Sequence, residues 1–322
     1  MFRCILYFAS RICAPRFLAP SWPAWRASAL GAMLPLLAPL VVPLVAACAL
    51  VVPEAPEPPL SYPPAARQRM LRIATAEWEE WGRRERVAGA AAEPAPLAAP
   101  ESDPANFSRV LAYWRAVDDD GGAAARNRPL YAAVLSGRAG AAAADALWRE
   151  PPWSAAFVSY VLRGAGVDRR EFPPDAAHSG YVDALLRDAE RFPALAPFVP
   201  HEPAGYAPRP GDLLCADRSF DPITHWRQRA TDAGRFRPMH CDIVVEAAAD
   251  FVLAVGGNLG DAVVRTRFPA DGAGRLLPPP PGIPAWFAVF ENRLGRLPPW
   301  DLPRDDGRPV PPPPPAPGSP RS

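Results

Sequence analysis

The stretch at residues 152–161, PWSAAFVSYV, decides the expected fold because it is typical of the start of an apolar helix. Pro151 and Pro152 end the Ala-rich segment before it, and glycines at 164 and 166 provide a stop, so we expect a helix over about 154–163. Its apolar side chains recur at helical spacing, which predicts one buried face. Those side chains are Phe157, Val158, Val161 and Leu162.

The order of the remaining segments indicates an α+β fold. Helical periodicity predicts further helices over residues 66–87, 107–117, 130–149 and 179–192. Short β-branched or aromatic runs predict strands at 212–216, 241–246, 251–255, 262–268 and 286–291. Helices followed by an antiparallel sheet are typical of the α+β class. Trp78 and Trp81 lie on the apolar stripe of the first helix, so we interpret them as core residues.

Composition predicts how the 322 residues are divided. We expect a signal peptide at 1–48, a Pro-rich linker at 49–64, an α+β domain at 65–295 and a disordered Pro-rich tail at 296–322. Within the domain, a helical part at 65–150 precedes the core at 151–295. Residues 219–239 are long and polar for a connection, which predicts either a functional loop or a flexible insertion. We interpret their arginines as part of a solvated loop, with contact to acidic wall polymers as the alternative.

The N-terminal segment resembles a secretory signal. Arginines precede an apolar run from Ala29 to Ala47, and the run ends in Val-Ala-Ala-Cys, which is similar to a bacterial lipobox. The expected result is an exported, periplasmic lipoprotein anchored to the membrane by lipid on Cys48. A plain signal peptide or a single membrane anchor is the alternative.

Charge and cysteine content narrow the expected partners. The formal net charge of +1 gives no global field that favours nucleic acid, so no nucleic-acid partner is expected.

Removal of the signal and lipidation of Cys48 leave Cys215 and Cys241, and an even pair in an exported protein predicts a disulfide. Two buried thiols, or a Cys215–His240 dyad, are the alternatives. His178, His201 and His225 lack metal-ligand spacing, and we expect neither a metal nor a cofactor.

Four short motifs resemble known families. They begin at Pro152, Pro210, His240 and Gly256, and read PWSAAF, PGD, HCDIV and GGNLGDAV. Together they are similar to CHAP-type and NlpC-type amidohydrolases, papain-like enzymes that cut cell-wall peptides. More narrowly, residues 67–294 resemble a bacterial domain-of-unknown-function family, number 2272, and this resemblance includes the EWEEWG stretch at 77–82.

The resemblance to the hydrolases implies a site. Where they have a catalytic Cys at the start of the central helix, this chain has Ser154. His240 matches the base, and Asn258 matches the polar residue that orients it. Asp242 is a rival orienter, because it shares a strand face with His240. Trp153, Ala155 and Gly257 are expected to line the substrate groove.

Each of these residues also has an ordinary structural interpretation. Ser154 follows two prolines and is typical of a helix N-cap, and Asn258 after two glycines is typical of a turn. The sequence therefore predicts either a cell-wall amide hydrolase with a Ser154 nucleophile, or an inactive papain-like module that binds wall peptides, glycan fragments or a protein. A purely structural lipoprotein is a third possibility without a specific motif.

Overall fold

The computed structural model of the chain describes residues 57–90, 99–279 and 283–295. The predicted signal segment with Cys48, and the predicted tail, lie outside the described residues. Where the predicted linker is described, it is bound to the domain: Leu60 N and the Tyr62 hydroxyl both donate to the Glu171 carboxylate. No helix among the described residues is long and apolar enough to cross a membrane.

The described chain is a mixture of helices and strands, which confirms the predicted α+β class. The helices are α1 (Ala65–Glu80), α2 (Phe107–Trp114), α3 (Ala123–Leu135), α4 (Ala141–Ala144), α5 (Ser154–Gly164) and α6 (His178–Arg191). The strands are β1 (Glu85–Val87), β2 (Phe198–His201), β3 (Leu213–Asp217), β4 (Met239–Ala247), β5 (Phe251–Gly256), β6 (Val264–Pro269) and β7 (Trp286–Asn292). The helix predicted from PWSAAFVSYV is α5.

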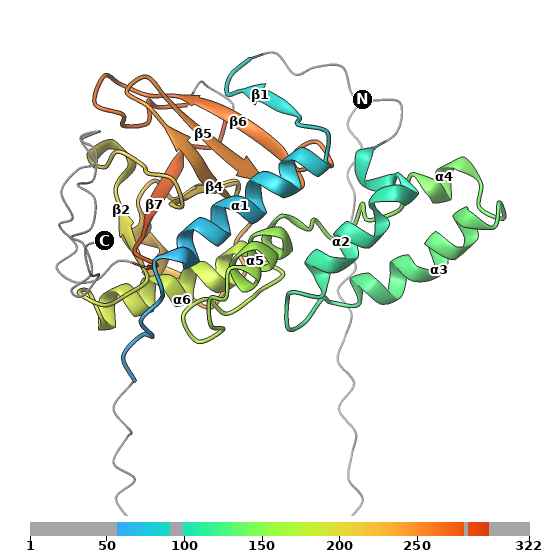
Figure 1. Cartoon of the computed structure of the whole chain (residues 1–322), viewed down its shortest axis with the longest axis horizontal. Coiled ribbons are helices and arrows are strands. Elements are labelled where there is room, and N and C mark those ends of the chain that lie inside the picture. Colours follow the sequence, from blue (N-terminus) through green and yellow to red (C-terminus); the bar gives the residue numbers. More distant parts are fainter. Residues whose placement is uncertain (1–56, 91–98, 280–282, 296–322) are drawn as a thin grey trace, which may run out of the picture. The chain divides into compact units, whose positions relative to one another are not determined.

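The strands form one seven-stranded sheet in the order β1-β6-β5-β4-β3-β7-β2 (Figure 1). All neighbours run antiparallel except β1, which pairs in parallel with β6. The first predicted helix is therefore too long: it ends at Glu80, where Gly82 and Arg83 turn with positive φ, and residues 85–87 become an edge strand. The sheet is mixed by this one pairing rather than wholly antiparallel.

Strand β4 is the middle strand, and α1, α5 and α6 all contact it (Figure 1). The side chains between these elements form the main core, which contains Trp78, Trp81 and the buried face of α5. Both tryptophans are core residues, as predicted. A second, smaller apolar cluster is formed by side chains of β3 to β7 and of the loops beside them, and it includes Leu214, Val244 and Phe268.

One other prediction on secondary structure is wrong, and one strand was missed. The Ala-rich helix expected at 130–149 is two helices, because the chain turns at Gly137 with positive φ between α3 and α4. Strand β2 was not predicted, since the prolines in and around it hide the strand pattern; it pairs at the sheet edge with β7, where proline is tolerated.

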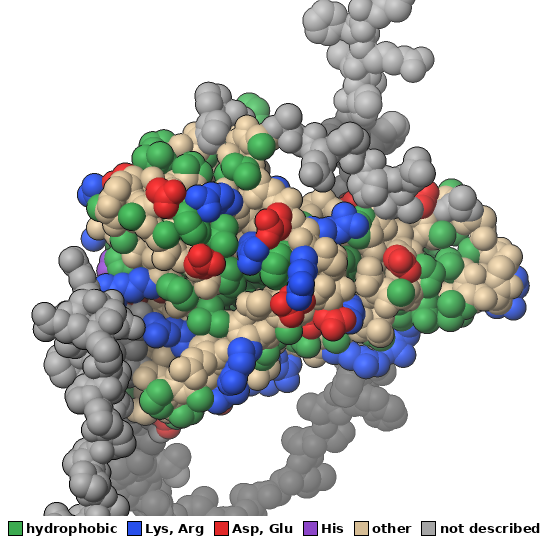
Figure 2. Space-filling view, turned by 45° about the horizontal axis from the view of Figure 1, so that its top comes forward, with side chains coloured by type: hydrophobic (Ala, Val, Ile, Leu, Met, Phe, Trp, Pro, Cys, Tyr) green, Lys and Arg blue, Asp and Glu red, His purple; other side chains and the backbone are tan. Residues whose placement is uncertain are grey.

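The face of the domain shown in Figure 2 has charged side chains of both signs. Basic and acidic side chains are interspersed there with apolar ones.

Candidate functional site

Ser154 is the first residue of α5, and its side chain does not cap the helix. The N-cap position belongs to Trp153, with no side-chain capping bond. The Ser154 hydroxyl is 2.7 Å from Nε2 of His178 instead. The N-cap interpretation of this serine is therefore wrong, because its hydroxyl is committed to a histidine. Only 8 % of the residue is exposed.

His178 is the first residue of α6, so two helix starts bring the serine and the histidine together. Its other ring nitrogen, Nδ1, is bonded to the Tyr181 hydroxyl one turn further along α6. Burial lowers the pKa of His178 well below its ordinary value, and positive charge at His240 and Arg218 acts in the same direction. The imidazole is therefore neutral. If its proton is on Nδ1, Tyr181 accepts it, and Nε2 is free to accept the proton of Ser154.

His240 and Asp242 form a second pair, two residues apart on β4. Nε2 of His240 lies 2.7 Å from Oδ1 of Asp242, as the alternation of a strand allows. Burial lowers the pKa of His240, although Asp242 opposes that shift. Burial alone would raise the pKa of Asp242, but the attraction of His240, Arg86 and Arg218 lowers it overall. The His240 ring thus donates Nε2–H to the Asp242 carboxylate.

The two pairs are adjacent. The rings of His178 and His240 have centroids 5.3 Å apart and are tilted by 59°. Ser154, His178, Tyr181, His240 and Asp242 are named the histidine cluster below. The residue bonded to Ser154 is His178, not the expected His240, and no hydrogen bond between Ser154 and His240 occurs among the described residues. Nδ1 of His240 is buried without a partner there.

Asn258 lies in the loop after β5 and contacts neither histidine by a hydrogen bond in the described structure. Its φ is 55°, in the left-handed region that asparagine tolerates, so the predicted turn is present. Its side chain donates to Oε2 of Glu101 at 2.9 Å, and the Trp153 indole donates to the same oxygen at 2.7 Å. The orienting contact to His240 comes from Asp242, and Asn258 instead fixes Trp153 through Glu101.

Glu101 was not predicted as part of any site. It is 2 % exposed. Burial raises its pKa to about 7, helped by negative charge at Asp261 and opposed by the bonds from Trp153 and Asn258. A single acidic residue before a helix gives no sequence pattern that would single it out. His178 left a weak signal: it opens a helix four residues after Pro174, much as Ser154 opens one two residues after Pro152.

The residues expected to line a groove are buried. Trp153 is 0 % and Ala155 1 % exposed, and Gly257 is also buried. A Cβ on Gly257 would lie 2.6 Å from Cβ of Phe157, and one on Gly256 would lie 1.9 Å from Oδ1 of Asp242. These glycines therefore let the end of β5 pack closely against α5 and β4. They belong to the packing around the cluster and not to an open groove.

The predicted disulfide is present. Cys215 and Cys241 face each other across β3 and β4, with Cα atoms 4.2 Å apart. This bond excludes the alternatives of two free thiols and of a Cys215–His240 dyad.

Most residues of the loop between β3 and β4 are exposed, as expected of a solvated loop, but buried charge anchors it. Arg229 is fully buried and forms a bidentate pair with Asp183 of α6, at 2.7 and 2.9 Å. Arg237 bonds to Asp217 and Asp232. This network fixes the loop beside the start of α6, where His178 lies. No group of three or more His, Cys, Asp or Glu suited to a metal occurs within the described residues.

A comparison with protein-family models finds a match within the α+β domain. The model of one bacterial family matches residues 101–294, which is more than half of the 322 residues. The chain belongs to this family, described as "Uncharacterized protein conserved in bacteria (DUF2272)". The match includes α2 to α6 and all strands except β1, whereas the EWEEWG stretch at 77–82 lies before it. No curated protein and no solved structure matches the chain significantly.

Proposed function

We propose that this protein is an exported cell-envelope enzyme that hydrolyses amide bonds of cell-wall peptides, with Ser154 as nucleophile. In this proposal the protein has a papain-like fold, similar to that of CHAP-type and NlpC-type amidohydrolases, and carries an N-terminal lipid on Cys48. The observation that carries it is the 2.7 Å contact between the Ser154 hydroxyl and Nε2 of His178. A hydroxyl within hydrogen-bond reach of a neutral imidazole is the geometry that nucleophilic catalysis requires.

The proposed chemistry starts with proton transfer from Ser154 to Nε2 of His178. The serine oxygen attacks the amide carbon, and the C–N bond breaks as the nitrogen takes the proton back from His178. Water then hydrolyses the acyl-serine with the same histidine as base. The first amides of α5 have no partner within the helix, so those of Ser154 and Ala155 are suited to stabilise the oxyanion.

His240 and Asp242 have a supporting role in this proposal. A proton on His178 is disfavoured by burial, as its lowered pKa records. Asp242 is bonded to His240, whose ring lies 5.3 Å from that of His178, and in this proposal its negative charge helps to stabilise the transient imidazolium of His178. His240 is thus moved from the base of the sequence-based prediction to the neighbour of the base.

The proposal is tested by incubating the purified protein with peptidoglycan and counting the amino groups released. We expect release by the wild type and none by Ser154→Ala. Ser159→Ala is the matched control, because Ser159 is a second buried serine of α5 whose hydroxyl bonds, within the described structure, only to the backbone carbonyl and amide of Asp175. Absence of release by a folded wild type, or equal release by Ser154→Ala, contradicts the proposal.

A second candidate is an inactive module that binds wall fragments or a protein. It is favoured by the burial of the cluster, since His178 and His240 are 4 % and 3 % exposed. In that case wild type and Ser154→Ala both sediment with peptidoglycan, and neither releases amino groups.

A further inference from the structure

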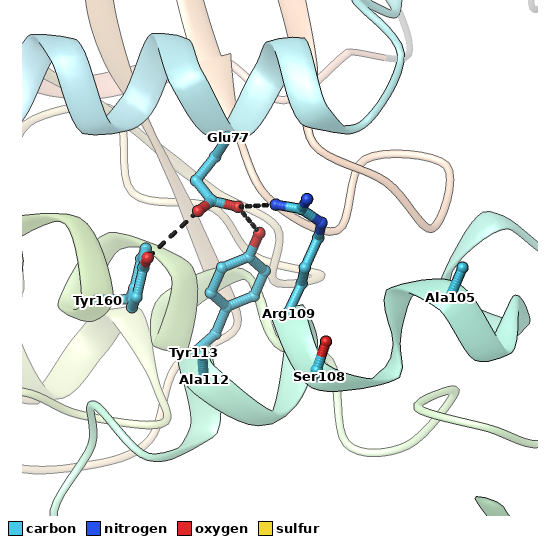
Figure 3. Close-up of a pocket in the computed structure, with 7 residues that line it drawn as sticks. All are labelled: Glu77, Ala105, Ser108, Arg109, Ala112, Tyr113 and Tyr160. Atoms are coloured by element: carbon cyan, nitrogen blue, oxygen red, sulfur yellow. Dashed lines mark hydrogen bonds and ion pairs between the residues drawn. The ribbon is translucent and has the colours of Figure 1, made fainter.

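A second polar site lies away from the histidine cluster, between α1, α2 and α5. There the described structure has a cavity of about 290 Å³ (Figure 3). Glu77 of α1, Ser108 and Arg109 of α2, and Tyr160 of α5 contribute its polar groups, and Tyr113 forms part of its wall. Ala105 and Ala112 are the remaining lining residues, and their small side chains leave the space open.

The Glu77 carboxylate is the centre of this pocket, although it is only 9 % exposed. Its Oε2 accepts from the Tyr113 hydroxyl and lies 3.8 Å from Nη1 of Arg109. Its Oε1 accepts only one hydrogen bond in the described structure, from the Tyr160 hydroxyl at 3.2 Å. Figure 3 shows both tyrosines and Arg109 converging on this one carboxylate. A carboxylate oxygen has capacity for a further donor.

The local charge is negative. Arg109 is shared between Glu77 and Glu80, so two carboxylates face one guanidinium. The pKa of Tyr160 is raised, first by burial and then by the negative charge of Glu77, which Arg109 only partly offsets. A cation entering the pocket would therefore meet an attractive potential.

Among the described residues that line the pocket, three acceptors have capacity for a further donor, and they come from three helices. They are Oε1 of Glu77, the Tyr160 oxygen and the Ser108 hydroxyl, which lies at the exposed rim. A primary ammonium has three N–H donors. The rings of Tyr113 and Tyr160, with centroids 5.1 Å apart, add aromatic surface that favours a cation and its alkyl chain.

We propose that this pocket binds a primary alkylammonium group, with Glu77 as its counter-ion. The amine belongs to the side chain of a peptide or to a free diamine. This binding does not depend on the chemistry proposed for Ser154. The pocket is nevertheless connected to that residue, because Tyr113 packs against Trp153 with ring centroids 5.3 Å apart.

The test is calorimetric titration of the full-length protein with Nα-acetyl-lysine methylamide, its Nε-acetylated form and 1,5-diaminopentane. We expect the lysine derivative to bind at least about 10-fold more tightly than the acetylated form, since acetylation removes the charge that Glu77 recognises. Tighter binding of the lysine derivative than of the diamine assigns a peptide source, and the reverse assigns a free diamine. No binding of either amine, or equal binding of the acetylated form, overturns the proposal.

Single substitutions test whether the amine binds in this pocket. Glu77→Gln should weaken it at least about 10-fold, whereas Glu79→Gln should leave it unchanged, because Glu79 is exposed on the same helix and pairs with Arg83. Ser108→Leu fills the pocket from the exposed rim and should abolish binding without unfolding the protein, as circular dichroism can verify. Ser154→Ala should bind like the wild type. Undiminished binding by folded Ser108→Leu overturns the proposed location.

Discussion

The histidine cluster and the Glu77 pocket are two polar sites of opposite design. The cluster consists of two hydroxyls, two imidazoles and a carboxylate, each in contact with a neighbour in the cluster. Almost none of their surface is exposed. The pocket has a cavity and unused acceptors but no group positioned to attack a substrate. Trp153 links them, since it precedes Ser154 in the chain and packs against Tyr113 in space.

This difference separates two kinds of evidence for function. Perturbed and mutually bonded titratable groups indicate where chemistry is possible, whereas accessible space indicates where a ligand fits. Variants in the two regions should consequently have different effects: loss of turnover in the cluster, and loss of ligand affinity in the pocket.

The largest difference is expected between His178→Asn and Glu77→Gln. Removal of the proposed base should lower kcat for amide hydrolysis at least about 1000-fold, because no other group is bonded to the Ser154 hydroxyl among the described residues. Glu77→Gln should change kcat less than about 10-fold and act on amine affinity. The measurement is steady-state kinetics, with His201→Asn as the control for loss of a histidine elsewhere.

A large effect on stability is expected from Asp183→Asn. The change removes the bidentate partner of the fully buried Arg229 and leaves Asp232 as its ion-pair partner, which should cost about 3 kcal/mol of unfolding free energy. Chemical denaturation measures it. The exposed pair Arg83–Glu79 provides the contrast: Glu79→Gln should cost less than about 1 kcal/mol. Equal effects of the two substitutions would contradict the structural role given to the anchored loop.

Glu101 gives a pH dependence of defined sign. Its pKa is raised to about 7 in the folded protein, so the protonated form is favoured there, and stability is lost as pH rises from about 4.5 to 7. Glu101→Gln keeps an acceptor for Trp153 and Asn258 and removes this loss. Relative to the variant, the wild type should lose up to about 3 kcal/mol across that window. His178 and His240 have lowered pKa values and act oppositely, losing stability as pH falls below their ordinary range, but they do so in both proteins. Thermal unfolding of both proteins between pH 4.5 and 8 checks the difference.

The smallest effect is expected at Asn258. Asn258→Gly loses the bond to Glu101 but relieves the left-handed backbone, and the two terms should leave stability within about 1 kcal/mol of the wild type. Turnover should be nearly unchanged, because the orienting contact to His240 is made by Asp242. A loss of turnover as large as that of His178→Asn would restore Asn258 as the orienting residue.

The fold was predictable where periodicity is strong. PWSAAFVSYV gives α5 because its apolar residues recur on one face, and all five predicted strands begin within two residues of β3, β4, β5, β6 and β7. Residues 85–87 could not be recognised as a strand, since their pairing with β6 depends on a partner about 180 residues away. The disulfide was predicted from the cysteine count together with the expected export, and the register of β3 on β4 aligns the two residues.

The site was predictable only in part. Ser154, His240 and Asp242 were identified from local motifs, and they do lie in one cluster. His178 was not predicted as a site residue, because a single histidine outside a motif carries no spacing information. The fold nevertheless brings the start of α6, with His178, to Ser154 at the start of α5. Glu101 and Glu77 were missed for the same reason: their importance comes from tertiary contacts and burial and not from their neighbours in the chain.

The central claim is that the histidine cluster activates the Ser154 hydroxyl. The most direct measurement is the intact mass of the protein after exposure to a fluorophosphonate, followed by peptide mapping of the adduct. We expect one covalent adduct, located at Ser154, in the wild type and in Ser159→Ala, and none in Ser154→Ala and His178→Asn. A folded wild type that forms no adduct, or labelling that persists in Ser154→Ala, would contradict it.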